Sequence, residues 1–267
     1  MSNYLEDQMP QDCADQRANV LGVGVSAIDM ARALALAELA LQNRQKGYVC
    51  VTGVHGVMEA QKDSEFKRIL NLSLINTPDG MPTVWVGRVQ GFSGMGRVFG
   101  PDFMQQMCAL SAKRSYTHFL YGGAPGVADE LKRNLLDRFP GLQIVGTFTP
   151  PFRPLNQVEQ EALLDQVHRV RPDIIWVGLS TPKQERFMAE FLPRLDTTLM
   201  VGVGAAFDIH TGRIKDAPEW MKHTGLQWLH RLLQEPRRLW KRYLINNPRF
   251  LWNIMVQLLG ARRFELP

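Results

Sequence analysis

Short apolar segments alternate with longer helix-like segments over most of this sequence, and that alternation limits its fold more than any other feature. Helical stretches of about ten to fifteen residues between apolar strands are typical of units in which parallel strands are covered by helices on both faces. The chain of 267 residues is also long enough for a large core. The sequence therefore predicts an α/β fold with a mostly parallel sheet. The expected strands are 20–25, 48–54, 69–75, 117–121, 142–146, 173–178 and 199–203, and the expected helices include 29–45, 57–70 and 156–169.

The alternation stops near Gly212, and residues 212–267 contain no strand-like segment. We therefore expect a loose arm at 1–17, an α/β core at 18–211 and a helical appendage at 212–267. From Asp216 to Pro267 there are nine Lys/Arg against four Asp/Glu, a surplus of +5 that equals the net charge of the whole chain. A basic end is expected to meet an acidic surface, either phospholipid head groups or a nucleic acid.

Cysteine usage and hydropathy indicate a cytoplasmic protein. Cys13, Cys50 and Cys108 are scattered thiols with neither metal-ligand spacing nor a disulfide framework, which fits a reducing compartment. No stretch approaches the roughly 18 apolar residues that span a bilayer. The N-terminus is acidic and lacks the apolar core of a signal peptide. We expect a cytosolic protein that touches a membrane at most from the side.

The segment 76–85, Asn-Thr-Pro-Asp-Gly-Met-Pro-Thr-Val-Trp, contains the first candidate site residue, Asp79. Pro78 suits the first turn of a helix. The Asp79 carboxylate is therefore expected at a strand-to-helix junction, near backbone N–H groups. Open α/β sheets bind ligands beyond the carboxyl ends of their strands. Two interpretations stay open: Asp79 caps a helix, or it acts on a ligand in that crevice.

Other expected strand ends also carry glycine or polar residues. In a parallel sheet these ends lie along one edge and can line a single cleft. Glycine there would let backbone N–H groups approach a phosphate closely. The residues concerned are Thr52, Gly122, Gly123, Gln184, Glu185, Gly204 and Asp208.

Several candidate side chains have structural alternatives. Gln184 ends a Thr181-Pro182-Lys183-Gln184 sequence that matches a helix capping box with proline at the first helical position, so it could cap a helix, contact a ligand, or do both. Arg97 lies in a glycine-flanked loop and could clamp a diphosphate or be a solvated surface side chain. His55 and His118 could act as bases or be structural histidines.

Missing motifs exclude several functional classes. No Gly-Lys-Ser/Thr phosphate loop occurs, so a nucleoside triphosphatase is not expected. No Asp-x-Asp occurs, which removes the usual carboxylate pair that holds a divalent ion on a nucleotide-sugar diphosphate. No Cys/His cluster has the spacing of a zinc site. The sequence predicts neither a metal site nor a cofactor.

The appendage combines basic and aromatic residues. Arg231, Arg238 and Arg242 are spaced by seven and four residues and would share one helical face if the helix continued past Pro236. Arginines interleaved with Trp240 and other amphipathic side chains fit a helix lying in a membrane interface. The alternatives are a solvated helix packed on the core and a nucleic-acid-binding surface, although no known reader motif occurs.

Six short motifs follow one another between about Gly22 and Phe250. They are Thr77-Pro78-Asp79-Gly80, Arg97-Val98-Phe99-Gly100-Pro101-Asp102, Tyr121-Gly122-Gly123, Pro182-Lys183-Gln184-Glu185, Gly202-Val203-Gly204-Ala205-Ala206-Phe207-Asp208 and Gln234-Glu235-Pro236-Arg237-Arg238-Leu239-Trp240-Lys241-Arg242-Tyr243. Together they resemble the WecG/TagA/CpsF family of bacterial glycosyltransferases (glycosyltransferase family 26), over nearly the whole chain.

The resemblance implies an inverting, metal-independent transfer of a sugar from a UDP-sugar to a polyprenyl-diphosphate-linked saccharide, in cell-surface polysaccharide biosynthesis at the inner face of the cytoplasmic membrane. It also implies a Rossmann-like core that binds the nucleotide sugar, and a C-terminal appendage that closes over the active site at the membrane. By position, the resemblance makes Asp79 the general base and Thr52 a sugar or acceptor contact. It makes Arg97 and Gln184 ligands of the diphosphate, and Asp208 a contact of the nucleotide. In the appendage, it implies that Arg231, Arg238 and Arg242 contact the lipid diphosphate and that Trp240 lies at the membrane.

One departure from the family concerns Val54, where many members have Asn. His55 beside it could replace that side chain, so the donor is left open among N-acetylmannosamine, its uronic acid, glucose and other sugars. Two rival hypotheses are a non-catalytic nucleotide-binding regulator and a nucleic-acid-binding protein that uses the basic end. The sequence leaves the oligomeric state open, a homo-oligomer included.

Overall fold

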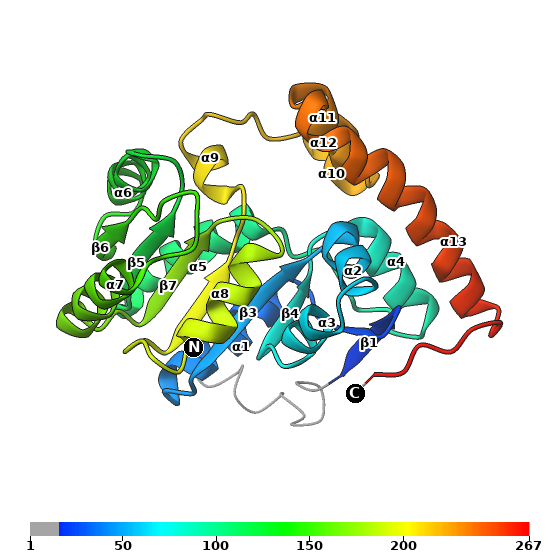
Figure 1. Ribbon diagram of the computed structural model, residues 1–267, viewed down its shortest axis with the longest axis horizontal. Coiled ribbons are helices and arrows are strands. Elements are labelled where there is room, and N and C mark those ends of the chain that lie inside the picture. Colours follow the sequence, from blue (N-terminus) through cyan, green and yellow to red (C-terminus); the bar gives the residue numbers. More distant parts are fainter. Residues whose placement is uncertain (1–15, 267) are drawn as a thin grey trace.

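A six-stranded parallel sheet forms the centre of the computed structural model, which describes residues 16–266 (Figure 1). Its strand order is β4-β3-β8-β7-β5-β6, and every neighbouring pair is parallel. The predicted α/β fold with a parallel sheet is therefore confirmed. The strands are β3 (Gly47–Thr52), β4 (Ile75–Pro78), β5 (Thr117–Gly122), β6 (Gln143–Phe148), β7 (Ile174–Gly178) and β8 (Leu199–Gly202).

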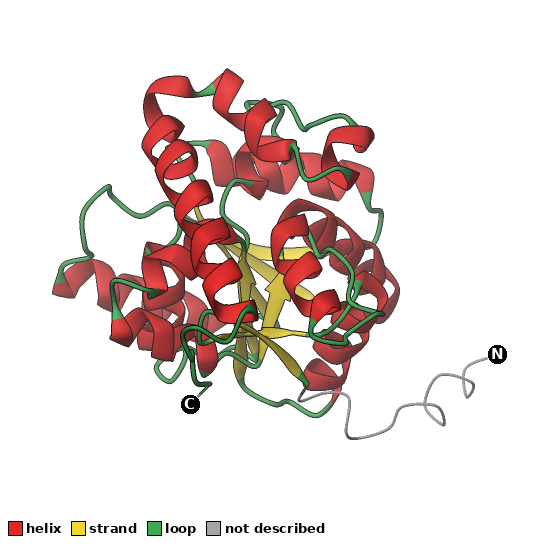
Figure 2. Ribbon diagram, turned by 90° about the vertical axis from the view of Figure 1, so that its right-hand side faces the viewer, coloured by secondary structure: helices red, strands yellow, loops and turns green. Residues whose placement is uncertain are grey.

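Both faces of the sheet are buried because successive strand residues point to opposite sides. In β3, Tyr48 and Cys50 join the apolar cluster on one face, whereas Val49 between them joins the cluster on the other. Helices cover both faces, as Figure 2 shows from the side. Side chains of α2 (Val54–Ala60), α3 (Ser64–Asn71), α7 (Gln157–Val170) and α8 (Lys183–Phe191) belong to the first cluster, and those of α1 (Met30–Gln42), α5 (Gly100–Arg114), α6 (Val127–Arg138) and α9 (Ala206–His210) to the second.

The prediction of a single strand at 20–25 is wrong. That segment contains the turn of an antiparallel hairpin between β1 (Arg17–Val20) and β2 (Val23–Ser26). Gly22 makes the turn with a φ of 79°, a conformation that costs glycine little. The side-chain amide of Asn76 in β4 donates from Nδ2 to Gly24 O at 2.9 Å, and this bond holds the hairpin at that edge of the sheet. Arg17, assigned to the loose arm, is the first residue of β1, while residues 1–15 of that arm lie outside the described part.

Two boundaries near Asp79 also differ from expectation. The apolar run 69–75 is not a strand: it begins in the last turn of α3, and β4 starts only at Ile75. Short apolar runs do not distinguish a buried helix turn from a strand. The expected helix at 57–70 is two helices, α2 and α3, because Asp63 caps a new helix start through the Phe66 N–H.

Pro78 closes β4 instead of starting a helix. The next helix, α4 (Met81–Val89), has Gly80 as its N-cap and Pro82 in its first turn. Asp79 therefore lies at the expected strand-to-helix junction without capping the helix. This excludes the simpler of the two interpretations of its carboxylate.

The C-terminal region is a chain of short helices followed by one long one, and α13 packs against α2 and runs back toward β1 (Figure 1). Phe250 and Ile254 are buried in the cluster that contains α2. Gln257 accepts from the Leu21 N–H at 2.9 Å and donates to Asn19 O at 2.7 Å. No helix among residues 16–266 is long and apolar enough to cross a membrane. The elements are α10 (Glu219–His223), α11 (Gln227–Gln234), α12 (Pro236–Trp240), a π-helical turn η2 (Lys241–Ile245) and α13 (Asn246–Leu258).

Candidate active site

A cleft of about 1010 Å³ lies between the C-terminal helices and the carboxyl edge of the sheet. Residues at or just after the ends of β3, β4, β7 and β8 form its floor, and α11, α12 and η2 supply the facing wall. Its lining contains eight Lys/Arg against three Asp/Glu, which favours an anionic ligand. Ten of the predicted site residues line it: His55, Asp79, Arg97, Gly123, Gln184, Gly204, Asp208, Arg231, Arg238 and Arg242.

Four predicted residues do not line this cleft. Thr52 is only 2% exposed, and its hydroxyl lies beneath the floor without a hydrogen-bond partner. Gly122 and Glu185 are also buried below the surface of the cleft. Trp240 lies on the outer side of the appendage and is 45% exposed. The contacts predicted for these residues with a sugar, a phosphate or a membrane remain predictions.

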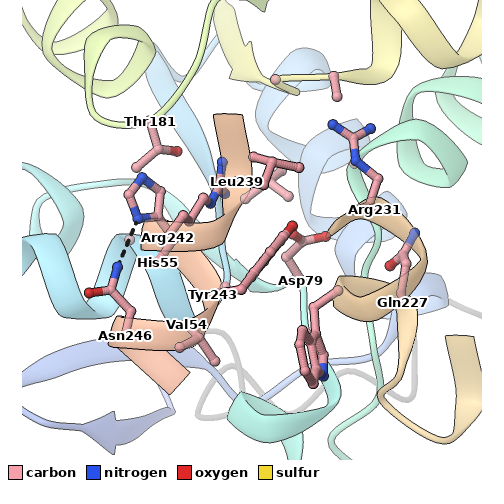
Figure 3. A pocket seen from close by; sticks show the side chains of 18 of the residues that line it. Val54, His55, Asp79, Thr181, Gln227, Arg231, Leu239, Arg242, Tyr243 and Asn246 are labelled. Carbon is pink, nitrogen blue, oxygen red and sulfur yellow. Dashed lines mark hydrogen bonds between the residues drawn. The ribbon is translucent and has the colours of Figure 1, made fainter. Parts of the chain in front are cut away.

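Asp79 places a carboxylate at the middle of the cleft (Figure 3). Its Oδ1 atom is buried and has no hydrogen-bond partner. Burial raises the pKa of the carboxyl group, while the Arg97 and Arg242 guanidinium groups and the Gly100 N–H at the start of α5 lower it. Burial is the largest of these effects, so Asp79 is a stronger proton acceptor than an exposed carboxylate.

Arg97 is fixed against the main chain beside this carboxylate. Its Nε donates to Asp79 O at 2.8 Å, and the next residue, Val98, donates its N–H to Pro78 O at 2.8 Å. The guanidinium also lies 4.4 Å from the centroid of the Phe99 ring. Arg97 is thus an anchored cation inside the cleft, and the alternative of a freely solvated surface arginine is wrong.

Gln184 and Glu185 form a buried polar pair at the start of α8. Gln184 Oε1 accepts from the Gly204 N–H at 3.0 Å, and its Nε2 donates to Glu185 Oε1 at 3.0 Å. Thr181 Oγ1 donates to the same Glu185 oxygen at 2.8 Å. The predicted capping box is wrong, because α8 begins at Lys183 with Pro182 as a cap that makes no side-chain bond. Instead, Gln184 ties the first turn of α8 to the loop that follows β8.

The glycine N–H groups expected to meet a phosphate are engaged within the protein. Gly123 donates to Gly178 O at 3.1 Å, and Gly204 donates to Gln184. Gly122 has a φ of 127°, and a Cβ there would lie 2.5 Å from Gly178 O. These glycines are therefore explained by close packing of backbone segments, and the expected phosphate contact through their N–H groups is not supported.

The two histidines have different surroundings. His118 is fully buried, accepts from Trp176 Nε1 at 2.7 Å and is structural; burial lowers its pKa to about 3. His55 lines the cleft and meets the Asn246 amide at 3.4 Å (Figure 3). Burial, and then the charge of Arg242, lower the pKa of His55 to about 4. At neutral pH, His55 is therefore an uncharged link between α2 and α13.

The three appendage arginines reach the cleft by a different route from the one expected. The condition for a shared helical face, a helix that continues past Pro236, is not met, since α11 ends at Gln234 and α12 begins at Pro236. Glu235 at the break accepts from Arg231 at 2.9 Å and from Arg238 at 2.6 Å. Arg242 is largely shielded from solvent: its Nε has no partner, and desolvation lowers its pKa. The bend, not a shared helical face, brings the arginines together.

Asp208, in α9, lines the cleft, as does Gly204 just before that helix. Burial raises the pKa of its carboxyl group, while Arg238, Arg213 and Arg231 lower it. The cleft therefore has a second half-buried acid, close to the appendage arginines.

Several lining residues were not singled out by sequence reasoning as parts of a site. Tyr243 is close enough to Asp79 for that carboxylate to raise the tyrosine pKa further, after the larger effect of burial. Its ring centroid lies 5.9 Å from that of Trp228. Gln227, Lys222 and Asn246 also face the cleft. The spacing of these residues in the sequence does not mark them as parts of a site, because each reaches the cleft only through the folding of the appendage over the core.

The described residues contain no group of three or more His, Cys, Asp or Glu side chains that could hold a metal ion. Cys50 and Cys108 are free and buried, and burial raises the pKa of both thiols. The carboxylates and the histidine that line the cleft are Asp79, Asp208, Glu59 and His55.

Comparison with known proteins identifies the family of this chain. The model of the family described as "Glycosyl transferase WecG/TagA/CpsF family" matches residues 18–264. One relative is the N-acetylglucosaminyldiphosphoundecaprenol N-acetyl-beta-D-mannosaminyltransferase of Bacillus subtilis (strain 168). It is 27% identical to this chain over 206 residues, which cover 77% of each protein.

Proposed function

This chain belongs to the WecG/TagA/CpsF family of glycosyl transferases, and from that premise we propose that it transfers a sugar from a UDP-sugar to a polyprenyl-diphosphate-linked saccharide. The observation that carries the proposal is the Asp79 carboxylate, whose Oδ1 atom has no hydrogen-bond partner, at the floor of a cleft rich in arginine. N-acetylmannosamine is the first candidate for the transferred sugar, because the relative from Bacillus subtilis is named for that activity. Its uronic acid and a neutral hexose are the other candidates.

We assign the proton transfer to Asp79. The hydroxyl oxygen of the acceptor attacks the anomeric carbon, the bond from that carbon to the UDP oxygen breaks, and the hydroxyl proton passes to the Asp79 carboxylate. Attack opposite the leaving group inverts the anomeric configuration. A positioned base of this kind contributes typically about 10²- to 10⁴-fold to the rate. The raised pKa of Asp79 favours proton uptake in the transition state.

Negative charge grows on the departing diphosphate, and the protein offers cations for it. Arg97 lies beside Asp79, and Arg242 is buried in the facing wall. Fixed cations in a partly desolvated cleft stabilise such charge more strongly than water does. We propose that these arginines replace the divalent ion that other nucleotide-sugar enzymes use, so that the reaction is independent of metal.

The acceptor carries a polyprenyl chain, and the appendage has an outer surface suited to a membrane interface. Leu244, Leu251 and Trp252 are 55%, 64% and 63% exposed. The cation Lys241 precedes them in the chain, and Arg249 lies between Leu244 and Leu251. Leu251 and Arg249 also line the rim of the cleft. We propose that this surface lies on the inner face of the cytoplasmic membrane, so that the diphosphate of the acceptor reaches Arg231, Arg238 and Arg242 while its lipid stays in the bilayer.

The test is a panel of UDP-sugars offered with a short-chain polyprenyl-diphosphate N-acetylglucosamine. We expect one donor to give a disaccharide whose new linkage has the inverted configuration by NMR, with turnover unchanged by a metal chelator. Asp79→Asn should fold normally but lose most of this turnover. UDP binding with no transfer to any acceptor would instead identify a nucleotide-binding regulator, and unchanged turnover in Asp79→Asn would exclude Asp79 as the base.

A further inference from the structure

We propose that Gln227 is a positioning residue, which orients the Arg97 guanidinium toward the diphosphate once the appendage lies over the core. The inference rests on the proposed function, since it takes Arg97 as a cation for the leaving group. Gln227 is in the first turn of α11, and 130 residues separate it from Arg97 in the chain. Figure 3 shows Gln227 facing the cleft on the same side as Arg231.

The core fixes only one end of the Arg97 guanidinium. The bond from Nε to Asp79 O sets where the group begins. Without a second contact, rotation about the last side-chain bonds of Arg97 would still move its two Nη atoms. Nη2 donates to Gln227 Oε1, and this second bond fixes the plane of the guanidinium. The remaining Nη donors are then held in one direction.

The amide of Gln227 can take only one orientation. Arg97 has donors and no acceptor, so the amide oxygen must face it. On the other side, Gln227 Nε2 donates to Asp216 Oδ1 at 3.4 Å, and a carboxylate only accepts. Asp216 is in turn paired with Lys222 at 2.7 Å, and Lys222 is only 9% exposed. The appendage therefore presents a preset acceptor to Arg97.

This arrangement predicts which step depends on Gln227. UDP gains charge as its bond to the sugar breaks, so a well-directed guanidinium matters more in the transition state and for free UDP than for the intact UDP-sugar. Removing the acceptor should lower kcat and weaken the binding of UDP, while the KM for the UDP-sugar stays nearly unchanged.

The appendage offers a matched control in the same helix. Gln234 also lies in α11 and also bonds the loop before α10, through Lys215 N at 3.1 Å and Lys215 O at 2.9 Å. It does not line the cleft. Gln234→Met therefore measures how much a glutamine contributes merely by holding α11 in place.

The experiment compares Gln227→Met, Gln234→Met, Arg97→Met and the Gln227→Met/Arg97→Met double variant, in the full chain, with the most active donor of the panel and with UDP as the binding probe. We expect Gln227→Met to lower kcat about tenfold, as misdirecting one donor to a developing charge does, and Gln234→Met to behave as the parent protein. In the Arg97→Met background, adding Gln227→Met should cost nothing further, because the residue acts only through Arg97.

Losses that add in the double variant, or equal losses in Gln227→Met and Gln234→Met, would overturn the proposal and leave Gln227 as a structural residue. If Gln227→Met does not fold, Gln227→Asn replaces it, because the shorter side chain keeps the amide but withdraws its oxygen from Arg97. Full turnover in Arg97→Met would instead reject the role of Arg97 in the proposed function.

Discussion

The side-chain oxygen of Gln184 accepts a hydrogen bond from the Gly204 N–H at 3.0 Å and thereby ties the first turn of α8 to the loop after β8. The nitrogen of the same amide donates to Glu185, which also accepts from Thr181. Gln184 and Glu185 are almost completely buried, so water does not compete for these bonds. Part of the cleft floor is thus held in place by side chains of its own loops.

Glu185→Ala should lower the free energy of unfolding. The change removes the acceptor of the Thr181 hydroxyl and leaves the buried Gln184 Nε2 donor unpaired, which costs about 1–3 kcal/mol. This loss outweighs the relief of no longer burying the unpartnered Oε2 atom. Urea denaturation measures the effect, and Glu185→Gln, which keeps an acceptor oxygen, should lose less. Equal stabilities of the Ala and Gln variants would contradict the assigned bonds.

The acid limb of the pH–activity profile should report Asp79. A base must be ionised, so kcat/KM is expected to fall as the pH drops through the raised pKa of this carboxyl group. Arg242 holds that pKa down. Arg242→Met should therefore move the acid limb of the residual activity to higher pH. Arg153→Met is the control, since Arg153 pairs with Glu159 at the surface, and a shift of equal size in this variant would argue against the assignment.

Stability should depend on pH through His55. The unfolded side chain takes up a proton near pH 6.5, whereas the folded one does so only near 4. The unfolded state binds more protons between these values, so stability should fall as the pH drops from 6.5 to 4, by about 3 kcal/mol from this residue.

His55→Gln removes that titration and keeps an acceptor for Asn246. His118 and His210, whose pKa values are also lowered, remain in both proteins. The difference in pH dependence between parent and variant, from denaturation at several pH values, therefore isolates His55. Parallel curves for the two proteins would rule out the buried neutral state of His55.

The outer surface of the appendage should determine binding to vesicles that contain anionic phospholipid. Trp240→Glu and Trp252→Glu are each expected to weaken sedimentation with such vesicles about tenfold, through loss of one interfacial side chain. Turnover of a short-chain acceptor in solution should stay the same, because neither tryptophan lines the cleft. Phe152→Glu is the control, since Phe152 is 91% exposed but lies outside the appendage. Unchanged vesicle binding in both tryptophan variants would exclude this surface.

Sequence reasoning located much of the candidate site because strand ends of a parallel sheet must lie along one edge. Asp79, Gln184 and Asp208 follow three different strands, and all three line the cleft. The same reasoning assigned glycine N–H groups to a ligand, although Gly123 and Gly204 use theirs within the protein. Local sequence does not show whether a donor is already engaged by a residue far away in the chain.

By itself, the sequence determined the layered α/β architecture and the residues at its strand ends, because the period of apolar residues sets which elements form and which faces they bury. Only the tertiary structure decided that β1 and β2 form a hairpin, that α11 and α12 bend at Glu235, and that Gln227 meets Arg97. These outcomes depend on contacts between segments as many as 130 residues apart, and no local pattern records such contacts.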